Sequence, residues 1–283
     1  MGNQASKTEE KHREQIQKTS SATGSTKKEI ETFKWQPPPI EEPVSYPVTL
    51  RKFASSSWNL RTVKEVENYV NKECGDLLEA SELTEGGWQE IFRDGERVRI
   101  WIRKTNATTY EYALKGKSKY PANVFFHTAY LDYHNRPRWD ESCGEATLLK
   151  KCEKTGIETF YWVTKYPWPV AERDYIFHRA ISKNQGSYQA ISWVGPAPHN
   201  SDLTEKLPKL VVEDVPKSRV RINDYRSMML VKPDIDGGSI WAIRVLCDPR
   251  VSLVPSNVIS WIIKRALPNS AYKLEKACEK SFS

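Results

Sequence analysis

Long hydrophobic runs are missing from this sequence of 283 residues. No apolar segment approaches the roughly 18 residues of a membrane-spanning helix, and no apolar signal-peptide segment follows the N-terminus. Cysteine is scarce, with five scattered residues and no CxxC spacing, so a disulfide framework is not indicated. We therefore expect a cytoplasmic protein with reduced thiols that does not span a membrane.

Catalytic signatures are missing as well. The five histidines show no metal spacing such as HExxH, and neither a GxSxG motif nor a phosphate-binding loop is present. The net charge of +7 favours attraction to anionic membrane surfaces, whereas no dense Lys/Arg patch for nucleic acid occurs. We expect a protein that is not an enzyme, has no cofactor or metal ion, binds no nucleic acid and touches membranes transiently.

Residues 1–55 are polar and end in a proline-punctuated stretch around 35–39, so we interpret them as a disordered arm and linker. The first six residues, MGNQAS, match the myristoylation pattern of Gly2 followed by serine at the sixth position. A single myristoyl chain binds membranes with a constant of only about 10⁴ M⁻¹. We therefore expect weak, switchable membrane contact through an acylated Gly2.

Residues 56–283 carry the periodic patterns of one folded domain. Helical spacing predicts helices at about 62–80, at 122–130 after Pro121, and from Ser256 to about Lys280 with a bend or restart at Pro268. Alternating segments bounded by glycine turns predict strands at 88–92, 98–103, 110–114, 145–152, 157–166, 174–183, 187–194, 216–231 and 239–247. This order is typical of an α+β domain whose antiparallel sheet curls around the last helix and leaves a hollow.

The stretch from Phe160 to Ala180 places two aromatic-rich segments around a proline-bracketed bend. It predicts two neighbouring strands that carry Tyr161, Trp162, Tyr175 and Phe177. Such aromatics often fill an ordinary core, but the polar tips of several of them suit the wall of a pocket for an amphipathic ligand. From this stretch alone, both interpretations stay open.

Further motifs occur in a fixed order between residues 58 and 281: Tyr130-Leu131-Asp132, Arg136, Trp139-Asp140, the run WVTKYPWP from Trp162, Arg173-Asp174-Tyr175 and Leu267-Pro268-Asn269. Together they resemble the START lipid-transfer family, and within it the phosphatidylcholine-transfer group. The resemblance implies a helix-grip fold, in which a curved antiparallel sheet wraps a long C-terminal helix and encloses a lipid. It also implies a monomer that carries one phosphatidylcholine per chain between membranes.

Carried over to this sequence, the family's choline cage is Trp162, Tyr175 and Tyr225. A quaternary ammonium donates no strong hydrogen bond and is held instead by aromatic faces. The resemblance assigns the lipid phosphate to the planar fork of Arg136, oriented by Asp140.

The resemblance also assigns to Tyr130 a hydroxyl that binds the lipid phosphate.

Ordinary structural roles remain possible for the same residues. Arg136 and Asp140, four residues apart, would also fit an ordinary surface pair on a helix, and the three cage aromatics would fit a plain core. We expect Trp139 to pack rather than contact the ligand. Asp140 with His134 would suit acid–base chemistry, as in hydrolase or cyclase relatives of this fold.

Lipid exchange needs an opening, and we expect Trp261 and Ile262 on the last helix, with the loop at 192–203, to form this gate. One alternative function is a lipid-dependent adaptor or sensor whose arm recruits a partner. Another is a carrier of sphingomyelin or phosphatidylethanolamine. The sequence does not separate phosphatidylcholine from sphingomyelin, because the two share a headgroup.

Overall fold

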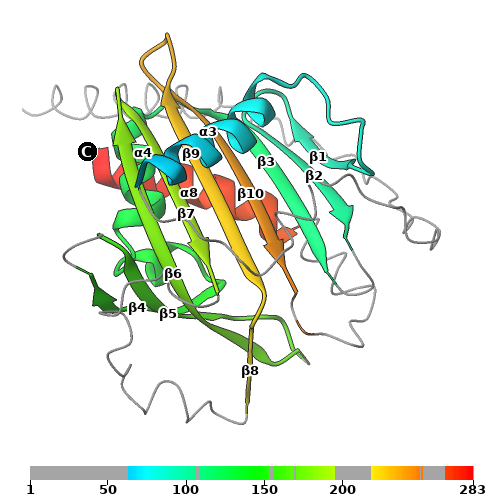
Figure 1. The fold of residues 1–283 in the computed structure, drawn as a ribbon, viewed down its shortest axis with the longest axis vertical. Coiled ribbons are helices and arrows are strands. Elements are labelled where there is room, and N and C mark those ends of the chain that lie inside the picture. Colours follow the sequence, from blue (N-terminus) through cyan, green and yellow to red (C-terminus); the bar gives the residue numbers. More distant parts are fainter. Residues whose placement is uncertain are drawn as a thin grey trace, which may run out of the picture. The chain divides into compact units, whose positions relative to one another are not determined.

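The computed structural model describes residues 63–105, 109–152, 156–168, 170–194, 218–248, 250 and 265–282. The predicted arm with Gly2, the gate residues Trp261 and Ile262, and most of the loop at 192–203 lie outside these residues. The described part contains one mainly antiparallel sheet with helices on both faces (Figure 1). The predicted α+β class is confirmed.

The helices predicted at 62–80 and 122–130 are confirmed, and so is the C-terminal helix over its described residues, whereas the short helix at 136–139 was not predicted. The helical elements are α3 (Val63–Glu79), α4 (Ala122–Phe126), the π-helical turn η1 (His127–Leu131), α5 (Arg136–Trp139) and α8 (Leu267–Phe282). The predicted helix at 122–130 is thus α4 continued by η1. Pro268 is the second residue of α8, which directly follows two π-helical residues at 265–266.

Ten strands are described, in the spatial order β1-β2-β3-β10-β9-β7-β6-β5-β4, with β8 beside β6. They are β1 (Gln89–Asp94), β2 (Val98–Lys104), β3 (Tyr110–Ser118), β4 (Cys143–Lys151), β5 (Glu158–Thr164), β6 (Glu172–Asn184), β7 (Ser187–Trp193), β8 (Arg219–Arg221), β9 (Tyr225–Pro233) and β10 (Ser239–Cys247). The turn between β6 and β7 has positive φ at Gln185 (48°) and Gly186 (79°), as a two-residue hairpin requires.

The prediction of one strand over 216–231 is wrong. The strand is interrupted at 222–224. The segment before the interruption, β8, runs parallel to β6 and does not continue into β9. Asp174 on β6 causes this arrangement. Its carboxylate binds Arg221 at 2.9 and 2.7 Å, and its carbonyl accepts the backbone N–H of Ile222 at 2.9 Å. The side chain of Ile222 is fully buried, so the chain turns inward at this point.

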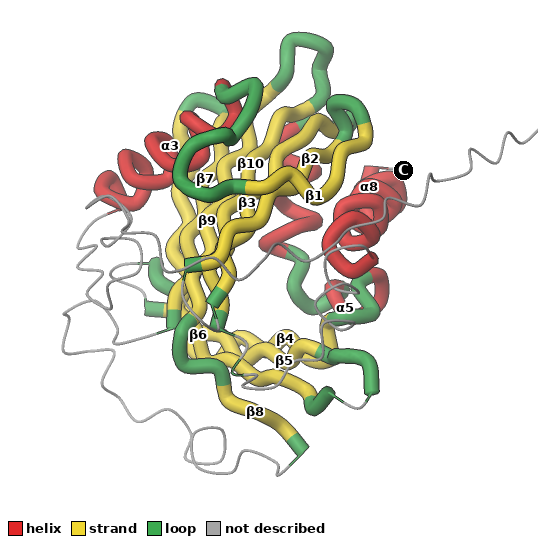
Figure 2. The backbone as a smooth tube through the Cα atoms, turned by 90° about the vertical axis from the view of Figure 1, so that its right-hand side faces the viewer, coloured by secondary structure: helices red, strands yellow, loops and turns green. Residues whose placement is uncertain are grey.

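The two faces of the sheet have different partners. Helix α3 covers one face, and α4, α5 and α8 lie on the other (Figures 1 and 2). Along β10, Ala242 and Leu246 belong to the core under α3, whereas Trp241 and Ile243 face the other side, as the period of two requires. The same alternation along each strand decides which side chains reach the α8 side.

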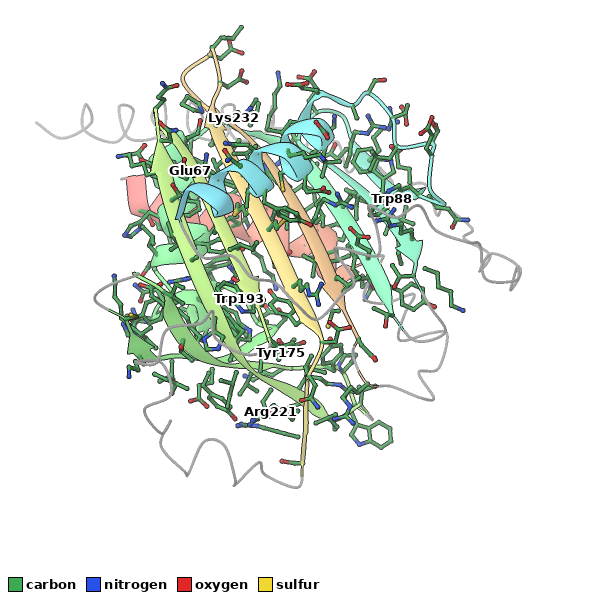
Figure 3. The ribbon with its side chains drawn as sticks, in the orientation of Figure 1. Glu67, Trp88, Tyr175, Trp193, Arg221 and Lys232 are labelled. Carbon is green, nitrogen blue, oxygen red and sulfur yellow. The ribbon has the colours of Figure 1, made fainter. Side chains whose placement is uncertain are left out.

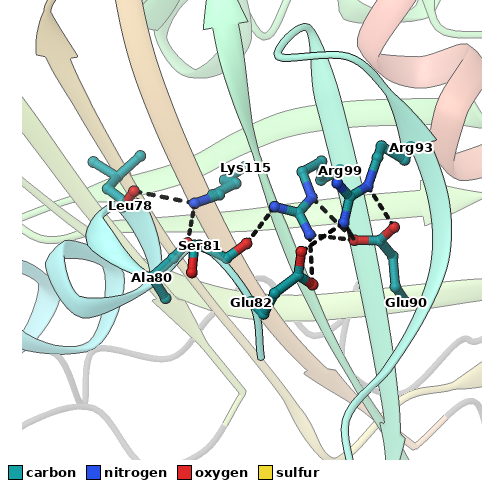
Figure 4. A network of polar contacts seen from close by, with 8 residues as sticks. All are labelled: Leu78, Ala80, Ser81, Glu82, Glu90, Arg93, Arg99 and Lys115. Atoms are coloured by element: carbon teal, nitrogen blue, oxygen red, sulfur yellow. Dashed lines mark hydrogen bonds and ion pairs between the residues drawn. The ribbon is translucent and has the colours of Figure 1, made fainter. Parts of the chain in front are cut away.

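Polar contacts fix the end of α3 to the sheet (Figure 4). Lys115 on β3 donates to the carbonyls of Leu78, at 3.1 Å, and Ala80, and so caps the C-terminus of the helix. Beyond the helix, Glu82 binds both Arg93 and Arg99 at 2.8 Å. Helix α3 therefore covers this face of the sheet, and polar contacts hold its C-terminal end in place.

Candidate functional site

A cavity of about 280 Å³ lies on the opposite face of the sheet, lined in part by residues of α4, α5 and α8. Protein interiors are close-packed, with few voids larger than a water molecule. A cavity of this volume is therefore a candidate binding site rather than a packing defect.

Strand β9 crosses the cavity wall and shows how its chemistry changes with position. Tyr225, Ser227 and Met229 are two residues apart and all line the cavity. Side chains on the neighbouring strands lie opposite these positions and form rows across the sheet. Ser227 lies opposite Ser192 on β7, and Met229 lies opposite Ile243 on β10. Successive rows are about 7 Å apart. The wall thus runs from an aromatic row through a polar row to an apolar row.

The aromatic row brings together the three predicted cage residues. Trp162 on β5 lies directly opposite Tyr175 on β6, and the Tyr175 ring meets the Tyr225 ring edge to face at 5.3 Å between centroids. Phe177 joins them, at 5.9 Å from Tyr225 and 6.3 Å from Trp162. All four line the cavity. Tyr175 lies at the end of the sheet near Arg221, away from Lys232 (Figure 3).

Tyr161 does not belong to this group. It follows Phe160 on β5, so it points to the opposite face of the sheet. There its hydroxyl accepts a hydrogen bond from Nη1 of Arg219 at 2.9 Å. Tyr161 lies on the predicted strand but not in the cavity wall, since adjacent residues of a strand face opposite ways.

Arg136 extends from the short helix α5 into the same cavity. Its Nε donates to Oδ2 of Asp140 at 2.8 Å, and its Nη1 donates to the carbonyl of Ala129 at 2.9 Å. Its guanidinium carbon lies 4.3 Å from the ring centroid of Trp139 and 5.7 Å from that of Trp162. Nη2 forms no hydrogen bond to the described residues. One side of the guanidinium is therefore anchored, and the other can bind an acceptor.

Asp140 is committed to holding this arginine. Its other oxygen, Oδ1, accepts hydrogen bonds from the backbone N–H and hydroxyl of Ser142 at 3.1 and 2.6 Å. Burial alone would raise the pKa of Asp140, but the charge of Arg136 and the Ser142 hydrogen bonds outweigh it and hold the pKa below its usual value. The side chains of Arg136 and Asp140 are only 22% and 6% exposed, so the surface-pair interpretation is wrong.

His134, the other half of the acid–base alternative, lies exposed with its ring 4.1 Å from that of Tyr133. Because both oxygens of Asp140 are bonded to Arg136 and Ser142, the structure does not bring His134 and Asp140 together as an acid–base pair.

Tyr130 lies on η1, a π-helical turn of the kind that often occurs at functional sites. Its ring stacks on Phe126 at 5.4 Å, and its hydroxyl lies 3.5 Å from Oγ of Ser227. Burial raises the pKa of the hydroxyls of Tyr130, Tyr175 and Tyr225 above the usual 10.0, so all three remain neutral donors at physiological pH.

Arg179 is a cavity-lining residue that the sequence reasoning missed. Its Nε and Nη2 bind Oε2 of Glu158 at 3.0 and 2.7 Å, and its Nη1 donates to the carbonyl of Tyr130. In contrast to Arg136, every nitrogen of its guanidinium has a protein partner. Arg179 lies two residues after Phe177 and four after Tyr175 on the same strand. This spacing indicates that all three side chains face the same side of the sheet, so it could have identified Arg179 as a cavity residue.

Trp139 both packs and lines the site. Its ring lies under the Arg136 guanidinium, as the packing prediction requires, and it also contributes to the cavity wall. Its Nε1 is buried without a hydrogen-bond partner among the described residues.

Among the described residues, no three His, Cys, Asp or Glu side chains are grouped in a way that could hold a metal ion. All five cysteines are described, and all are free thiols. None of the described helices combines the length and apolar character needed to cross a bilayer.

Sequence comparison identifies a match to the START domain model over residues 68–281. The human mitochondrial StAR-related lipid transfer protein 7 is 26% identical over 208 residues, which cover 72% of this chain and 52% of that protein. The chain thus spans about half the length of this relative. Bovine phosphatidylcholine transfer protein is 27% identical over 219 residues, covering 75% of this chain and 93% of that protein.

Solved structures show the same fold. Human STARD10 superposes with a TM-score of 0.60 at 19% identity and covers 79% of this chain and 82% of its own. Human StAR-related lipid transfer protein 5 gives a TM-score of 0.55 at 14% identity, covering 78% of this chain and 99% of its own. At these identities the likeness concerns the fold alone, and it confirms the predicted sheet with a C-terminal helix. The domain boundary near residue 55 stays a prediction.

Proposed function

Because the chain belongs to the START domain family, we propose that it binds one phosphatidylcholine molecule in the cavity and transfers it between membranes without catalysing a reaction. The observation that carries this proposal is the position of Arg136. Its Nη2 has no hydrogen-bond partner among the described residues, and its guanidinium lies beside Trp162 of the aromatic row. A phosphate on Arg136 would place the adjoining choline among the aromatic rings.

The charges around the cavity favour a lipid without net charge. Arg136 is balanced by Asp140, and Arg179 is balanced by Glu158. An anionic lipid would add a buried charge with no counter-charge, which costs several kcal/mol. A zwitterionic lipid brings its own counter-charge, so the balance is kept.

The cationic group of that lipid meets aromatic faces rather than acceptors. No acidic side chain occurs among the described residues that line the cavity. A primary ammonium, as in phosphatidylethanolamine, needs several hydrogen-bond acceptors, whereas a quaternary ammonium needs π faces, each worth about 0.5–2 kcal/mol. The aromatic row therefore favours choline over ethanolamine. The similarity to bovine phosphatidylcholine transfer protein supports this choice.

The test is mass spectrometry of lipid that co-purifies with the folded protein, beside an Arg136→Ala variant. We expect phosphatidylcholine at one molecule per chain in the wild type and its loss in the variant. An ethanolamine lipid, a sterol or a ceramide in the wild type would overturn the choline assignment. Sphingomyelin has the same headgroup, and its presence would shift the assignment to that lipid.

The adaptor alternative is separated from the carrier by turnover. A carrier present in catalytic amounts moves many lipids between donor and acceptor vesicles, whereas an adaptor binds one lipid and stops. Acylation of Gly2, a cytoplasmic location and a gate at Trp261 and Ile262 remain predictions. Intact-mass measurement of protein from eukaryotic cells tests the first of them.

A further inference from the structure

Two serines lie directly opposite each other in the cavity wall. Ser192 on β7 pairs with Ser227 on β9 in the antiparallel register, and both line the cavity. Directly opposed residues point to the same face of a sheet, with Cβ atoms about 4.5–5.5 Å apart. The two hydroxyls therefore form a single polar patch between strands.

The two hydroxyls differ in the partners they have within the protein. Ser192 is 3% exposed and Ser227 is 4% exposed. The Ser192 hydroxyl forms no hydrogen bond to the described residues. Oγ of Ser227 lies 3.5 Å from the Tyr130 hydroxyl, at the long limit for a hydrogen bond, and it also interacts with the Tyr225 hydroxyl. Buried hydroxyls usually have partners. An acceptor atom on a bound ligand would supply a partner for the Ser192 hydroxyl. It could also accept the Ser227 proton, because the Ser227 oxygen can accept hydrogen bonds from the two tyrosine hydroxyls.

The position of the pair along β9 indicates which part of a ligand reaches it. Tyr225 precedes Ser227 by two residues and belongs to the aromatic row, and Met229 follows by two residues in the apolar row. A phospholipid has the same order, from a cationic headgroup through its ester linkages to its acyl chains. The serines therefore lie where the ester linkages would be.

We propose that Ser192 and Ser227 form a subsite whose hydroxyls donate hydrogen bonds to the carbonyl oxygens at the junction of headgroup and acyl chains. This assignment rests on the proposed phosphatidylcholine function and deepens it. Neutral hydroxyl donors suit neutral carbonyl oxygens, while the charged phosphate has Arg136. Carbonyls at this junction occur as esters in glycerolipids and as an amide in sphingolipids, and two opposed hydroxyls match the two esters better.

The test compares three choline lipids in competition for the full-length protein against a fluorescent phosphatidylcholine. They are dioleoyl phosphatidylcholine, its diether analogue without carbonyls, and sphingomyelin with one carbonyl. We expect the diester to bind about 10- to 25-fold more tightly than the diether, because each of the two net hydrogen bonds is worth about three- to fivefold. Sphingomyelin should fall between the two.

In a Ser192→Ala/Ser227→Ala variant, the preference for diester over diether should fall to about one, because only the diester loses partners. Ser239→Ala is the matched control, since Ser239 is also a fully buried strand serine but does not line the cavity. Its diester preference should equal that of the wild type.

Equal binding of diester and diether by the wild type would overturn the subsite, and this result needs no variant to fold. A diester preference that survives in the double variant would also overturn it. Sphingomyelin binding as tight as diester binding would overturn the assignment to paired esters. Failure of the wild type to bind any choline lipid is a different result, because it overturns the proposed function itself.

Discussion

Tyr175 and Tyr225 meet edge to face with ring centroids 5.3 Å apart, although their strands β6 and β9 are separated in the sheet by β7. They meet because β7 ends at Trp193, opposite His178, whereas β6 begins at Glu172. Beyond the end of β7, the aromatic rings fill the space between β6 and β9. The proposed choline site is thus located where a strand of the sheet stops.

Removing a ring from the aromatic row should weaken binding of choline lipids selectively. We expect Trp162→Ala or Tyr225→Ala to reduce phosphatidylcholine affinity by about 2- to 30-fold, since each cation–π contact is worth about 0.5–2 kcal/mol. Affinity for phosphatidylethanolamine should change much less. Tyr161→Phe is the control, because Tyr161 faces away from the cavity. A loss of equal size for both lipids, measured by competition binding, would assign the rings to packing.

Replacing the guanidinium of Arg136 by an ammonium group tests whether its hydrogen-bonding geometry matters in addition to its charge. Arg136→Lys keeps the charge but cannot bind Asp140, Ala129 and a phosphate at once. We expect phosphatidylcholine affinity to fall by about tenfold or more, because a hydrogen bond to a charged group contributes about 1.5–3 kcal/mol. Arg138→Lys, on the exposed side of α5, should bind as the wild type does. Full binding by the Lys variant would show that charge alone suffices.

Stability should depend on pH through Asp140. Its pKa is lower in the folded protein than the ordinary value near 3.8. A carboxyl of this kind contributes stability that is fully present above its unfolded pKa and is lost as the pH falls through the folded pKa. We therefore expect the contribution to be constant from about pH 7 to about pH 5 and to disappear below about pH 4.

Denaturant unfolding of the wild type beside Asp140→Asn measures this contribution. The difference in free energy of unfolding between the two proteins should be largest near neutral pH and should shrink in acid. A difference that is the same at every pH would mean that the ionisation of Asp140 is unimportant.

Breaking the pair of Arg179 and Glu158 should destabilise the fold. Their side chains are 6% and 12% exposed, so Arg179→Met leaves a nearly buried carboxylate without its main partner. We expect a loss of about 3–5 kcal/mol in the free energy of unfolding. The double variant Arg179→Met/Glu158→Leu should recover most of it, because two apolar side chains replace two charges. Failure of the double variant to recover stability would assign the loss to the Tyr130 carbonyl contact instead.

Much of the site could be predicted from the sequence, because the patterns that indicate it lie within short segments of the chain. Alternation along 174–183 places Tyr175, Phe177 and Arg179 on one face, and Asp94-Gly95 and Gln185-Gly186 define two hairpins. The spacing of four between Arg136 and Asp140 also determined that they can pair. Motifs spread along the chain indicated the family, and the comparisons confirm it.

Other features depend on contacts between distant residues. The break between β8 and β9 is set by Asp174, far away in sequence, and the burial of the Arg136–Asp140 pair depends on the sheet that α5 packs against. The joining of Tyr175 with Tyr225, and the pairing of Ser192 with Ser227, follow from strand order and register. Residue periodicity determines which face a side chain occupies, but only the packed sheet determines which faces meet. The sequence alone therefore determined the residues available to the cavity, and the tertiary structure decided how they are combined.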